Sequence, residues 1–244
     1  MRPWHSALPV IGLATLASAC TAAGPHTNTP HGNLAPMTYL ALGDSYTIGE
    51  GVPENGRWPV QLAAMLRDEG IALAEPRIIA TTGWTTDELS TAIDAAGPLG
   101  PFDFVSLLIG VNNQYRGRDV QEYRGEFSAL LERAIALAGG RADRVLVLSI
   151  PDWGVTPFAA AQYAQQRGRD AARIASELDA YNAAARAVCA ARGVAFVDIT
   201  PVSRARGSEA EMLADDGLHP SAAMYAQWTA LALPVARELL TTAP

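Results

Sequence analysis

The chain has 244 residues, of which 49% are hydrophobic, and a formal net charge of −7 at pH 7. This length supports one hydrophobic core and is too short for two comfortable ones, so we expect a single folded domain. All 18 basic residues are Arg and are spread along the chain without a basic run, so the sequence offers no electrostatic basis for nucleic acid as a partner.

The first 19 residues have the layout of a secretory signal peptide. The apolar stretch within them is too short to span a membrane. Cys20 follows directly and resembles the lipidated cysteine of a bacterial lipobox, although such boxes usually have Leu where this chain has Ala17. The small residues 17–19 also suit an ordinary signal-peptidase site. We therefore expect an exported protein, either a cell-envelope lipoprotein that touches the membrane only through a lipid on Cys20 or a secreted protein.

Residues 20–36 are rich in Pro, Gly, Thr, Asn and His and carry almost no apolar surface, so we expect a disordered tether there. The folded domain is expected over residues 37–244. Its single cysteine, Cys189, lies in an Ala-rich helical pattern in which a buried thiol is the usual outcome. Lipidation of Cys20 would leave Cys189 without a disulfide partner.

Short apolar runs alternate with amphipathic stretches along this domain. Thr85 and Glu88 have the spacing of a capping box at the start of one amphipathic stretch. Five alternations of strand and helix predict a three-layer α/β domain around a parallel sheet. The patterns predict strands at 39–42, 77–80, 102–109, 144–150 and 194–199, and helices at 58–69, from 85 onward, and at 120–138, 170–192 and 221–240.

Ser45 follows the first apolar run, in the segment Gly43-Asp44-Ser45-Tyr46. The run has no helical period, which is typical of a strand buried on both faces, and a glycine allows a sharp turn after it. Ser45 would then stand at the carboxyl end of a strand, where open α/β sheets bind their ligands. The alternative is that Asp44 and Ser45 only cap the next helix.

His219 is the only histidine after residue 36, so an imidazole base in the folded domain has to be this residue. Asp216 lies three residues before it, on a polar loop between the last predicted strand and the last predicted helix. From there its carboxylate can accept a hydrogen bond from the imidazole and fix the tautomer. The alternative is that Asp216 and Ser221 cap the last helix while His219 is an exposed loop residue.

Gly83 and Asn112 follow the second and third predicted strands. The backbone N–H of Gly83 and the side-chain amide of Asn112 are suitable hydrogen-bond donors to a developing oxyanion. Each also has a simpler interpretation, as a turn glycine and as an Asx-turn residue. With Ser45 and His219, however, they complete the nucleophile, base and oxyanion donors that acyl transfer needs.

In these motifs the sequence resembles the SGNH or GDSL hydrolases, a family of serine esterases and lipases, from about residue 39 to the end of the last helix. The resemblance implies a flavodoxin-like, five-stranded parallel sheet and an ester of a small molecule, lipid or carbohydrate as substrate. It also implies a catalytic triad of Ser45, Asp216 and His219, and an oxyanion hole formed by the N–H groups of Ser45 and Gly83 and by the Asn112 side chain. The matching motifs are Gly43-Asp44-Ser45-Tyr46, Gly83, Gly110-Val111-Asn112-Asn113 and Asp216-Gly217-Leu218-His219-Pro220.

Two positions depart from the usual pattern of that family. The third motif usually reads Gly-x-Asn-Asp, and Asn113 stands in place of that Asp. This change leaves the proposed donor Asn112 intact but alters the residue that holds its loop. The second motif is usually richer in Asn and Gly than the segment around Gly83.

Other classes of function are less consistent with the sequence. The Gly-x-Ser-x-Gly elbow of ordinary α/β-hydrolases is absent, and the first strand is not followed by the Gly-x-Gly-x-x-Gly of dinucleotide-binding domains. We expect no cofactor and no metal, because one histidine without a cysteine pair does not make a typical zinc site. The alternative function is a non-catalytic envelope lipoprotein that binds carbohydrate or lipid on the same fold, and the complete Ser-His-Asp set argues against it.

Several aromatic residues follow the predicted strand ends. Trp84, Tyr115 and Trp153 are candidates for the substrate-binding site. Phe158 and Tyr163 lie in the same region of the sequence, and for these two we prefer a packing role. An acetyl esterase would need a shallow site, whereas a lipase would need a long apolar groove.

Overall fold

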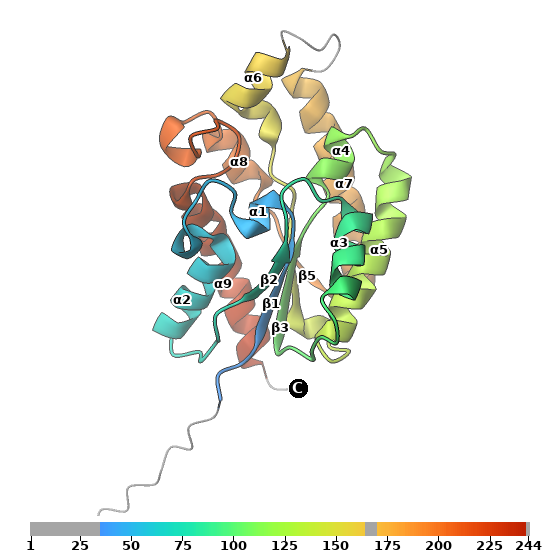
Figure 1. Cartoon of the computed structure of the whole chain (residues 1–244), viewed down its shortest axis with the longest axis vertical. Helices are drawn as coiled ribbons and strands as arrows, with labels where there is room; N and C mark the ends of the chain where they lie inside the picture. Colours follow the sequence, from blue (N-terminus) through green and yellow to red (C-terminus); the bar gives the residue numbers. More distant parts are fainter. Residues whose placement is uncertain (1–34, 164–169, 243–244) are drawn as a thin grey trace, which may run out of the picture. The chain divides into compact units, whose positions relative to one another are not determined.

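A five-stranded parallel sheet forms the centre of the computed structural model (Figure 1), which describes residues 35–163 and 170–242. The strand order is β2-β1-β3-β4-β5, so the order reverses between β1 and β3 as in flavodoxin-like sheets. This confirms the expected α/β fold. The predicted signal peptide, Cys20 and most of the predicted tether lie outside the described residues. The strands are β1 (Tyr39–Gly43), β2 (Arg77–Ala80), β3 (Phe104–Leu108), β4 (Val145–Leu148) and β5 (Ala195–Val197).

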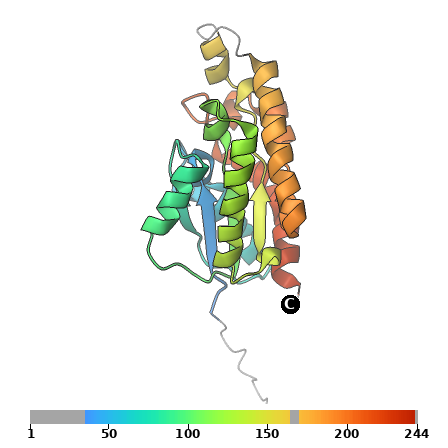
Figure 2. The same ribbon diagram turned by 90° about the vertical axis from the view of Figure 1, so that its right-hand side faces the viewer.

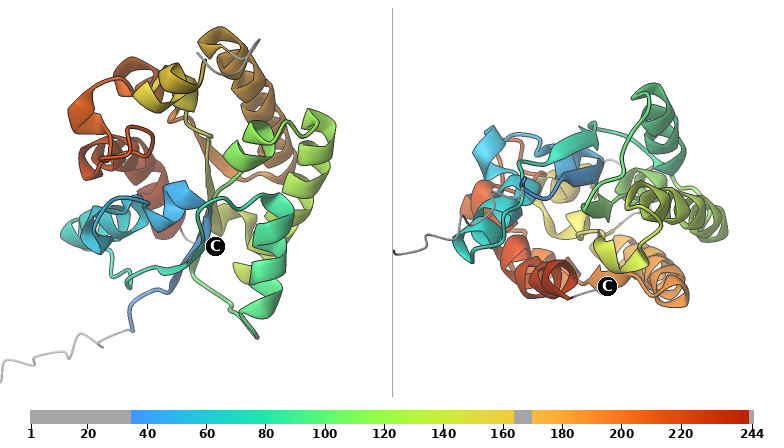
Figure 3. Two further views of the ribbon diagram at one scale, coloured as in Figure 1. Left: turned by 45° about the horizontal axis from the view of Figure 1, so that its top comes forward. Right: turned by 90° about the horizontal axis from the view of Figure 1, so that it is seen from below.

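Helices cover both faces of the sheet (Figure 1 and Figure 2). On one face, α2 (Trp58–Asp68) packs against α9 (Ala222–Thr241). The other face is covered by α3 (Thr86–Ala95), α5 (Val120–Leu137) and α7 (Ala171–Arg192). The right-hand view of Figure 3, seen from below, shows the two helical layers on either side of the strands.

Shorter elements follow the carboxyl ends of the strands, at the upper end of the sheet in Figure 1. Because the connections at this end are irregular, they leave room for a site above the sheet. These elements are α1 (Ser45–Ile48), α4 (Val111–Tyr115), α6 (Pro157–Tyr163) and α8 (Thr200–Arg206), together with the 3₁₀ turns η1 (Glu54–Gly56), η3 (Trp153–Val155) and η4 (Ala210–Met212). A further 3₁₀ turn, η2 (Ala142–Arg144), lies at the opposite end, directly before β4.

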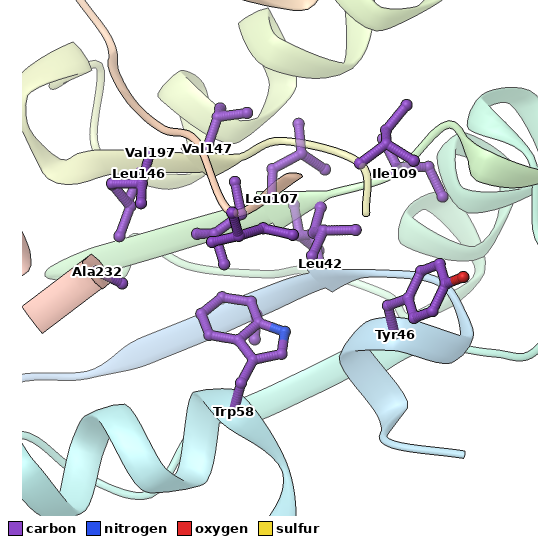
Figure 4. Packing of buried hydrophobic residues seen from close by; sticks show 14 of the residues in the cluster. Leu42, Tyr46, Trp58, Leu107, Ile109, Leu146, Val147, Val197 and Ala232 are labelled. Atoms are coloured by element: carbon purple, nitrogen blue, oxygen red, sulfur yellow. The ribbon is translucent and has the colours of Figure 1, made fainter. Parts of the chain in front are cut away.

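The hydrophobic core lies against both faces of the sheet (Figure 4). Leu42 of β1 stands in register with Ile79 of β2 and Leu107 of β3, and all three are buried. Trp58 at the start of α2 is fully buried beneath β1. Every residue of β1, β3 and β4 is buried, which explains why these strands read as apolar runs without alternation.

Capping residues set the ends of the long helices close to the predicted bounds. The capping box of Thr85 and Glu88 is present, with the Thr85 N–H donating to Glu88 Oε2 at 2.9 Å. Helix α7 begins after the N-cap Asp170 and ends at Gly193, which has a φ of 66°. Ser221 caps α9.

Several elements differ from the sequence-based expectation. Strand β3 begins at Phe104, after a contact in which Thr38 donates its N–H to Asp103 Oδ2 at 2.6 Å, and β4 and β5 are also shorter than predicted. Helices α1, α4, α6 and α8 are not among the predicted elements. Pro201 lies in the first turn of α8, where proline favours a helix start, so this signal was present in the sequence.

The remaining expectations about the domain concern its cysteine and its helices. Cys189 is buried on α7 as expected, and burial raises the pKa of its thiol to about 12. Within the two described segments, every helix is too short or too polar to span a bilayer.

Candidate active site

A cavity of about 200 Å³ opens at the carboxyl ends of β1, β2 and β3. It lies beside the point where the strand order reverses, which is the expected ligand position in such sheets. The fold brings six of the predicted site residues to this one cavity, namely Ser45, Gly83, Asn112, Tyr115, Trp153 and His219. The lining residues are Ser45, Tyr46, Thr82, Gly83, Val111, Asn112, Tyr115, Trp153, Phe158, Leu218 and His219.

Ser45 is the first residue of α1, directly after β1. Asp44 is the N-cap of this helix, and its Oδ1 accepts the N–H of Tyr46 at 3.0 Å. The two interpretations of this segment therefore describe one structure, in which Asp44 caps the helix and Ser45 faces the cavity. Gly43 is required at the turn, because a Cβ there would lie 2.5 Å from the carbonyl oxygen of Leu108.

Asp44 is a fully buried carboxyl next to the proposed nucleophile. Its Oδ2 has no hydrogen-bond partner among the described residues. Burial raises the pKa of Asp44 to about 7, although the hydrogen bond from the Tyr46 N–H acts in the opposite direction. Its pKa therefore lies well above that of an exposed aspartate.

His219 and Asp216 are hydrogen-bonded as predicted, with Nδ1 of His219 2.5 Å from Oδ2 of Asp216. Oδ1 of Asp216 accepts the N–H groups of Leu218 and His219, both at 2.9 Å. Burial opposes the charge of Asp216, but the hydrogen bonds from the His219 ring and these two N–H groups outweigh it and hold the pKa of the carboxyl below its usual value. Because the carboxylate accepts from Nδ1, the neutral imidazole carries its proton there and leaves Nε2 as an acceptor.

Asn112 lies on α4 and lines the cavity. Its Nδ2 donates to the backbone carbonyl of Trp84 at 2.9 Å. A side-chain amide has two N–H donors, so this contact fixes the orientation of the group and leaves the second donor for a ligand.

Gly83 lies in a turn that the Trp84 N–H closes on the carbonyl of Thr81 at 3.2 Å. Its φ of 89° is the value that the third residue of a type II turn needs, and glycine adopts it without strain. Gly83 lines the same cavity as Ser45 and Asn112.

Asn113, which departs from the family pattern, joins the two segments that carry Gly83 and Asn112. Its Oδ1 accepts the N–H of Thr86 at 3.1 Å. Its Nδ2 donates to Thr86 Oγ1 at 2.6 Å and to Glu126 Oε2 at 3.3 Å. The hydroxyl of Thr86 also donates to Glu126. The carboxylate in this cluster therefore belongs to Glu126 on α5, and an amide at position 113 complements it.

The set of aromatic side chains that line the cavity differs from the predicted set. Tyr115 and Trp153 line the cavity, with their rings edge to face at 5.3 Å between centroids. Phe158 also lines it, whereas a packing role was preferred for this residue. Trp84 does not line the cavity, because its side chain packs partly buried against the hydrophobic core. The side chain of Tyr163 lies outside the described residues.

The sequence reasoning missed four residues in the cavity wall, Tyr46, Thr82, Val111 and Leu218. All four are direct neighbours in sequence of a predicted site residue, so this adjacency was the available signal. Within residues 35–163 and 170–242, no group of three or more His, Cys, Asp or Glu side chains is placed to hold a metal ion.

The fold is similar to that of several solved structures. TesA is 21% identical with a TM-score of 0.61, over 83% of this chain and 99% of its own. A lipase/acylhydrolase from Enterococcus faecalis is 22% identical with a TM-score of 0.55, over 85% of this chain and 99% of its own. An acetyl xylan esterase from Geobacillus stearothermophilus is 18% identical with a TM-score of 0.56, over 82% of this chain and 94% of its own.

At these identities the structural similarity concerns the fold. Among curated proteins, none is similar enough to this chain to count as a relative. The sequence itself, however, matches the model of the GDSL-like lipase/acylhydrolase family over residues 41–227, which is most of the chain. The chain therefore belongs to the GDSL-like lipase/acylhydrolase family.

Proposed function

We propose that this protein is a serine esterase that hydrolyses carboxylic esters with short acyl chains. The observation that carries the proposal is that Ser45, Asn112 and His219 surround one largely apolar cavity, with Asp216 hydrogen-bonded to the far side of the imidazole. Membership of the lipase/acylhydrolase family supports hydrolysis as the reaction class.

In the proposed acylation step, His219 Nε2 takes the proton of the Ser45 hydroxyl while Oγ attacks the ester carbonyl. Asp216 holds the ring through Nδ1 and stabilises the imidazolium that forms. The imidazolium then gives its proton to the leaving alcohol. In deacylation, His219 takes a proton from water as the water attacks the acyl carbonyl, and the imidazolium returns this proton to Ser45 Oγ as the acid leaves.

The negative charge on the tetrahedral intermediate needs fixed hydrogen-bond donors. Ser45 is the first residue of α1, so its N–H has no acceptor within the helix. The Gly83 N–H and the second donor of Asn112 belong to the same cavity wall. Donors of this kind typically contribute about 2.7–4 kcal/mol each to stabilisation of the transition state.

The size and lining of the cavity support a short, apolar acyl group. A volume of about 200 Å³ lies below the roughly 300–1,000 Å³ of pockets that bury drug-sized ligands, so it suits a short acyl group. Tyr115, Trp153 and Phe158 form an aromatic part of the wall, and the lining contains no Arg, Asp or Glu. We therefore expect the highest kcat/KM for p-nitrophenyl butyrate or hexanoate, and lower values for the decanoate and dodecanoate.

The proposal is tested with the purified full-length protein and a series of p-nitrophenyl esters from acetate to dodecanoate. Ser45→Ala and His219→Ala should each lose nearly all activity, whereas Ser208→Ala, a change of an exposed serine, should keep it. If the parent, Ser45→Ala and His219→Ala hydrolyse these esters at the same rate, the hydrolysis does not arise at this site. That result would favour a non-catalytic protein that binds carbohydrate or lipid. A maximum at the decanoate or longer would contradict the assignment of short acyl chains.

We also propose that the protein is exported and is held at the cell envelope by a lipid on Cys20. The apolar segment within residues 1–19 supports export, and the position of Cys20 directly after this segment supports lipidation. Cys20→Ala should move the protein from the membrane fraction to the soluble fraction, and an unchanged distribution would contradict the anchor.

A further inference from the structure

The proposed oxyanion site draws two of its donors from different segments, Gly83 from the turn after β2 and Asn112 from α4. Both must keep a fixed separation, because catalysis falls steeply when reacting groups are misplaced by about 1 Å. The Asn112 side chain already ties this turn to α4 through the carbonyl of Trp84. Gly83 itself has no side chain to pack, and a Cβ built on it would meet no atom within 4 Å, so a further contact on its backbone is needed to fix the direction of its N–H.

Arg116 supplies a direct restraint on this turn. Its NH2 group donates to the carbonyl oxygen of Gly83 at 2.7 Å. The N–H of Arg116 donates to the carbonyl of Asn112 at 3.0 Å, so Arg116 follows Asn112 by one helical turn. The segment from Asn112 to Arg116 therefore carries the side-chain amide donor and also binds Gly83, the residue that provides the second donor.

The guanidinium of Arg116 is itself held in place by Glu88 on α3. NH1 lies 3.0 Å from Oε1 of Glu88, and NH2 lies 3.2 Å from Oε2. Glu88 Oε2 also accepts the N–H of Thr85 in the capping box that begins α3. The planar guanidinium therefore joins a helix start, the Gly83 turn and the helix of Asn112 in one rigid connection.

We propose that Arg116 is a positioning residue for the reaction, which fixes the Gly83 donor relative to the Asn112 donor. The inference rests on the proposed esterase function. The side chains of Arg116 and Glu88 are 43% and 39% exposed, and ion pairs this exposed contribute little to stability. Loss of Arg116 should therefore lower the turnover rate while leaving the fold and substrate binding nearly unchanged.

The test compares Arg116→Ala and Arg116→Lys with a matched control, Arg133→Ala. Arg133 joins α5 to α3 through Asp94 and Ser90, so its removal also deletes a guanidinium-carboxylate pair but leaves the Gly83 turn untouched. With p-nitrophenyl butyrate, Arg116→Ala should lower kcat by about tenfold or more and change KM by less than about twofold. Arg116→Lys should give an intermediate kcat, because an ammonium does not reproduce the planar fork.

A second measurement separates positioning from a general structural effect. Phenylboronic acid adds to a serine hydroxyl as a tetrahedral anion, so its affinity reports on the oxyanion site. Arg116→Ala should weaken its binding by about the same factor as kcat/KM and leave the melting temperature close to that of Arg133→Ala. The proposal is overturned if Arg116→Ala keeps kcat within about twofold of the parent, if Arg133→Ala falls equally, or if boronate affinity does not change. A fully active Ser45→Ala would instead overturn the esterase function itself.

Discussion

Asp44 offers a test of the site that depends on stability and not on turnover. Its carboxyl is fully buried at the start of the helix that carries Ser45. In the parent, Asp44 Oδ1 accepts the Tyr46 N–H at 3.0 Å. Asp44→Asn keeps an oxygen that can accept this hydrogen bond and removes the charge. We expect the variant to gain stability relative to the parent as the pH rises.

The size of this gain follows from linkage between ionisation and folding. Burial raises the pKa of Asp44 from 3.8 to about 7, so the folded state binds more protons than the unfolded state between these values. A buried carboxyl with a raised pKa therefore lowers the stability of the folded protein as the pH rises through that window. At pH 8 the cost is about 3 pKa units at 1.36 kcal/mol each, or about 4 kcal/mol. Between pH 5 and the folded pKa of about 7, the difference between variant and parent should grow by about 3 kcal/mol.

The assay is urea unfolding of the parent and Asp44→Asn at pH 5 and pH 8, from which the difference in free energy of unfolding is taken at each pH. Burial of the new amide adds a contribution that does not change with pH, so the test is the growth of the difference. Asp87→Asn serves as a control, because the hydrogen bond from Arg118 lowers the pKa of Asp87 to about 2 and its effect should be nearly flat over this range. A difference for Asp44→Asn that is the same at pH 5 and pH 8 would refute the reasoning.

Three further predictions concern the cavity and its supports. Asn113→Asp would place a carboxylate where Nδ2 now lies 3.3 Å from Glu126, so kcat should fall by about tenfold, and adding Glu126→Gln should restore it if charge repulsion is the cause. Asp216→Asn should lower kcat by about 10³ to 10⁴, because the amide no longer fixes the His219 tautomer, and pre-steady-state kinetics should place the loss in acylation. Tyr115→Ala should shift the preferred p-nitrophenyl ester toward longer acyl chains with little change in melting temperature, because this side chain is 38% exposed at the cavity and is not part of the core. An unchanged chain-length profile would contradict that role.

The fold could be predicted from the sequence because its signals are local. Apolar runs such as Tyr39–Gly43 are buried on both faces, and a capping box marks the start of α3. The pairing of Asp216 with His219 was equally accessible, since only three residues separate them and the domain has a single histidine. Alternation of strands and helices then places Ser45 at the same end of the sheet as this pair.

The contacts that support the proposed oxyanion site could not be predicted in this way. Arg116 is 33 residues from Gly83, and Asn113 is 13 residues from Glu126. Arginine and glutamate are common on helix surfaces, so the presence of Arg116 or Glu126 in the sequence does not indicate a contact with the site. These contacts become visible only when α3, α4 and α5 are placed side by side.

The aromatic wall of the cavity could not be predicted from the sequence either. Phe158 reaches it because its N–H donates to the carbonyl of Gly217 at 3.1 Å, which docks the start of α6 against the loop of His219. Trp84 follows a strand directly, yet its side chain packs against the core while its carbonyl accepts the Asn112 amide. Proximity to a strand end therefore selects the region of the site but not the direction of a side chain.

The two halves of the site are held by different kinds of interaction. Ser45 and His219 are both buried, and the elements beneath them belong to the core. The turn that carries Gly83 is held in part by the half-exposed pair of Arg116 and Glu88, beside the contact of Asn112 with the Trp84 carbonyl. Because exposed ion pairs contribute little to stability, we expect substitutions of this pair to change the position of Gly83 without unfolding the domain. Substitutions in the core beneath Ser45 and His219, by contrast, should also lower the stability of the fold.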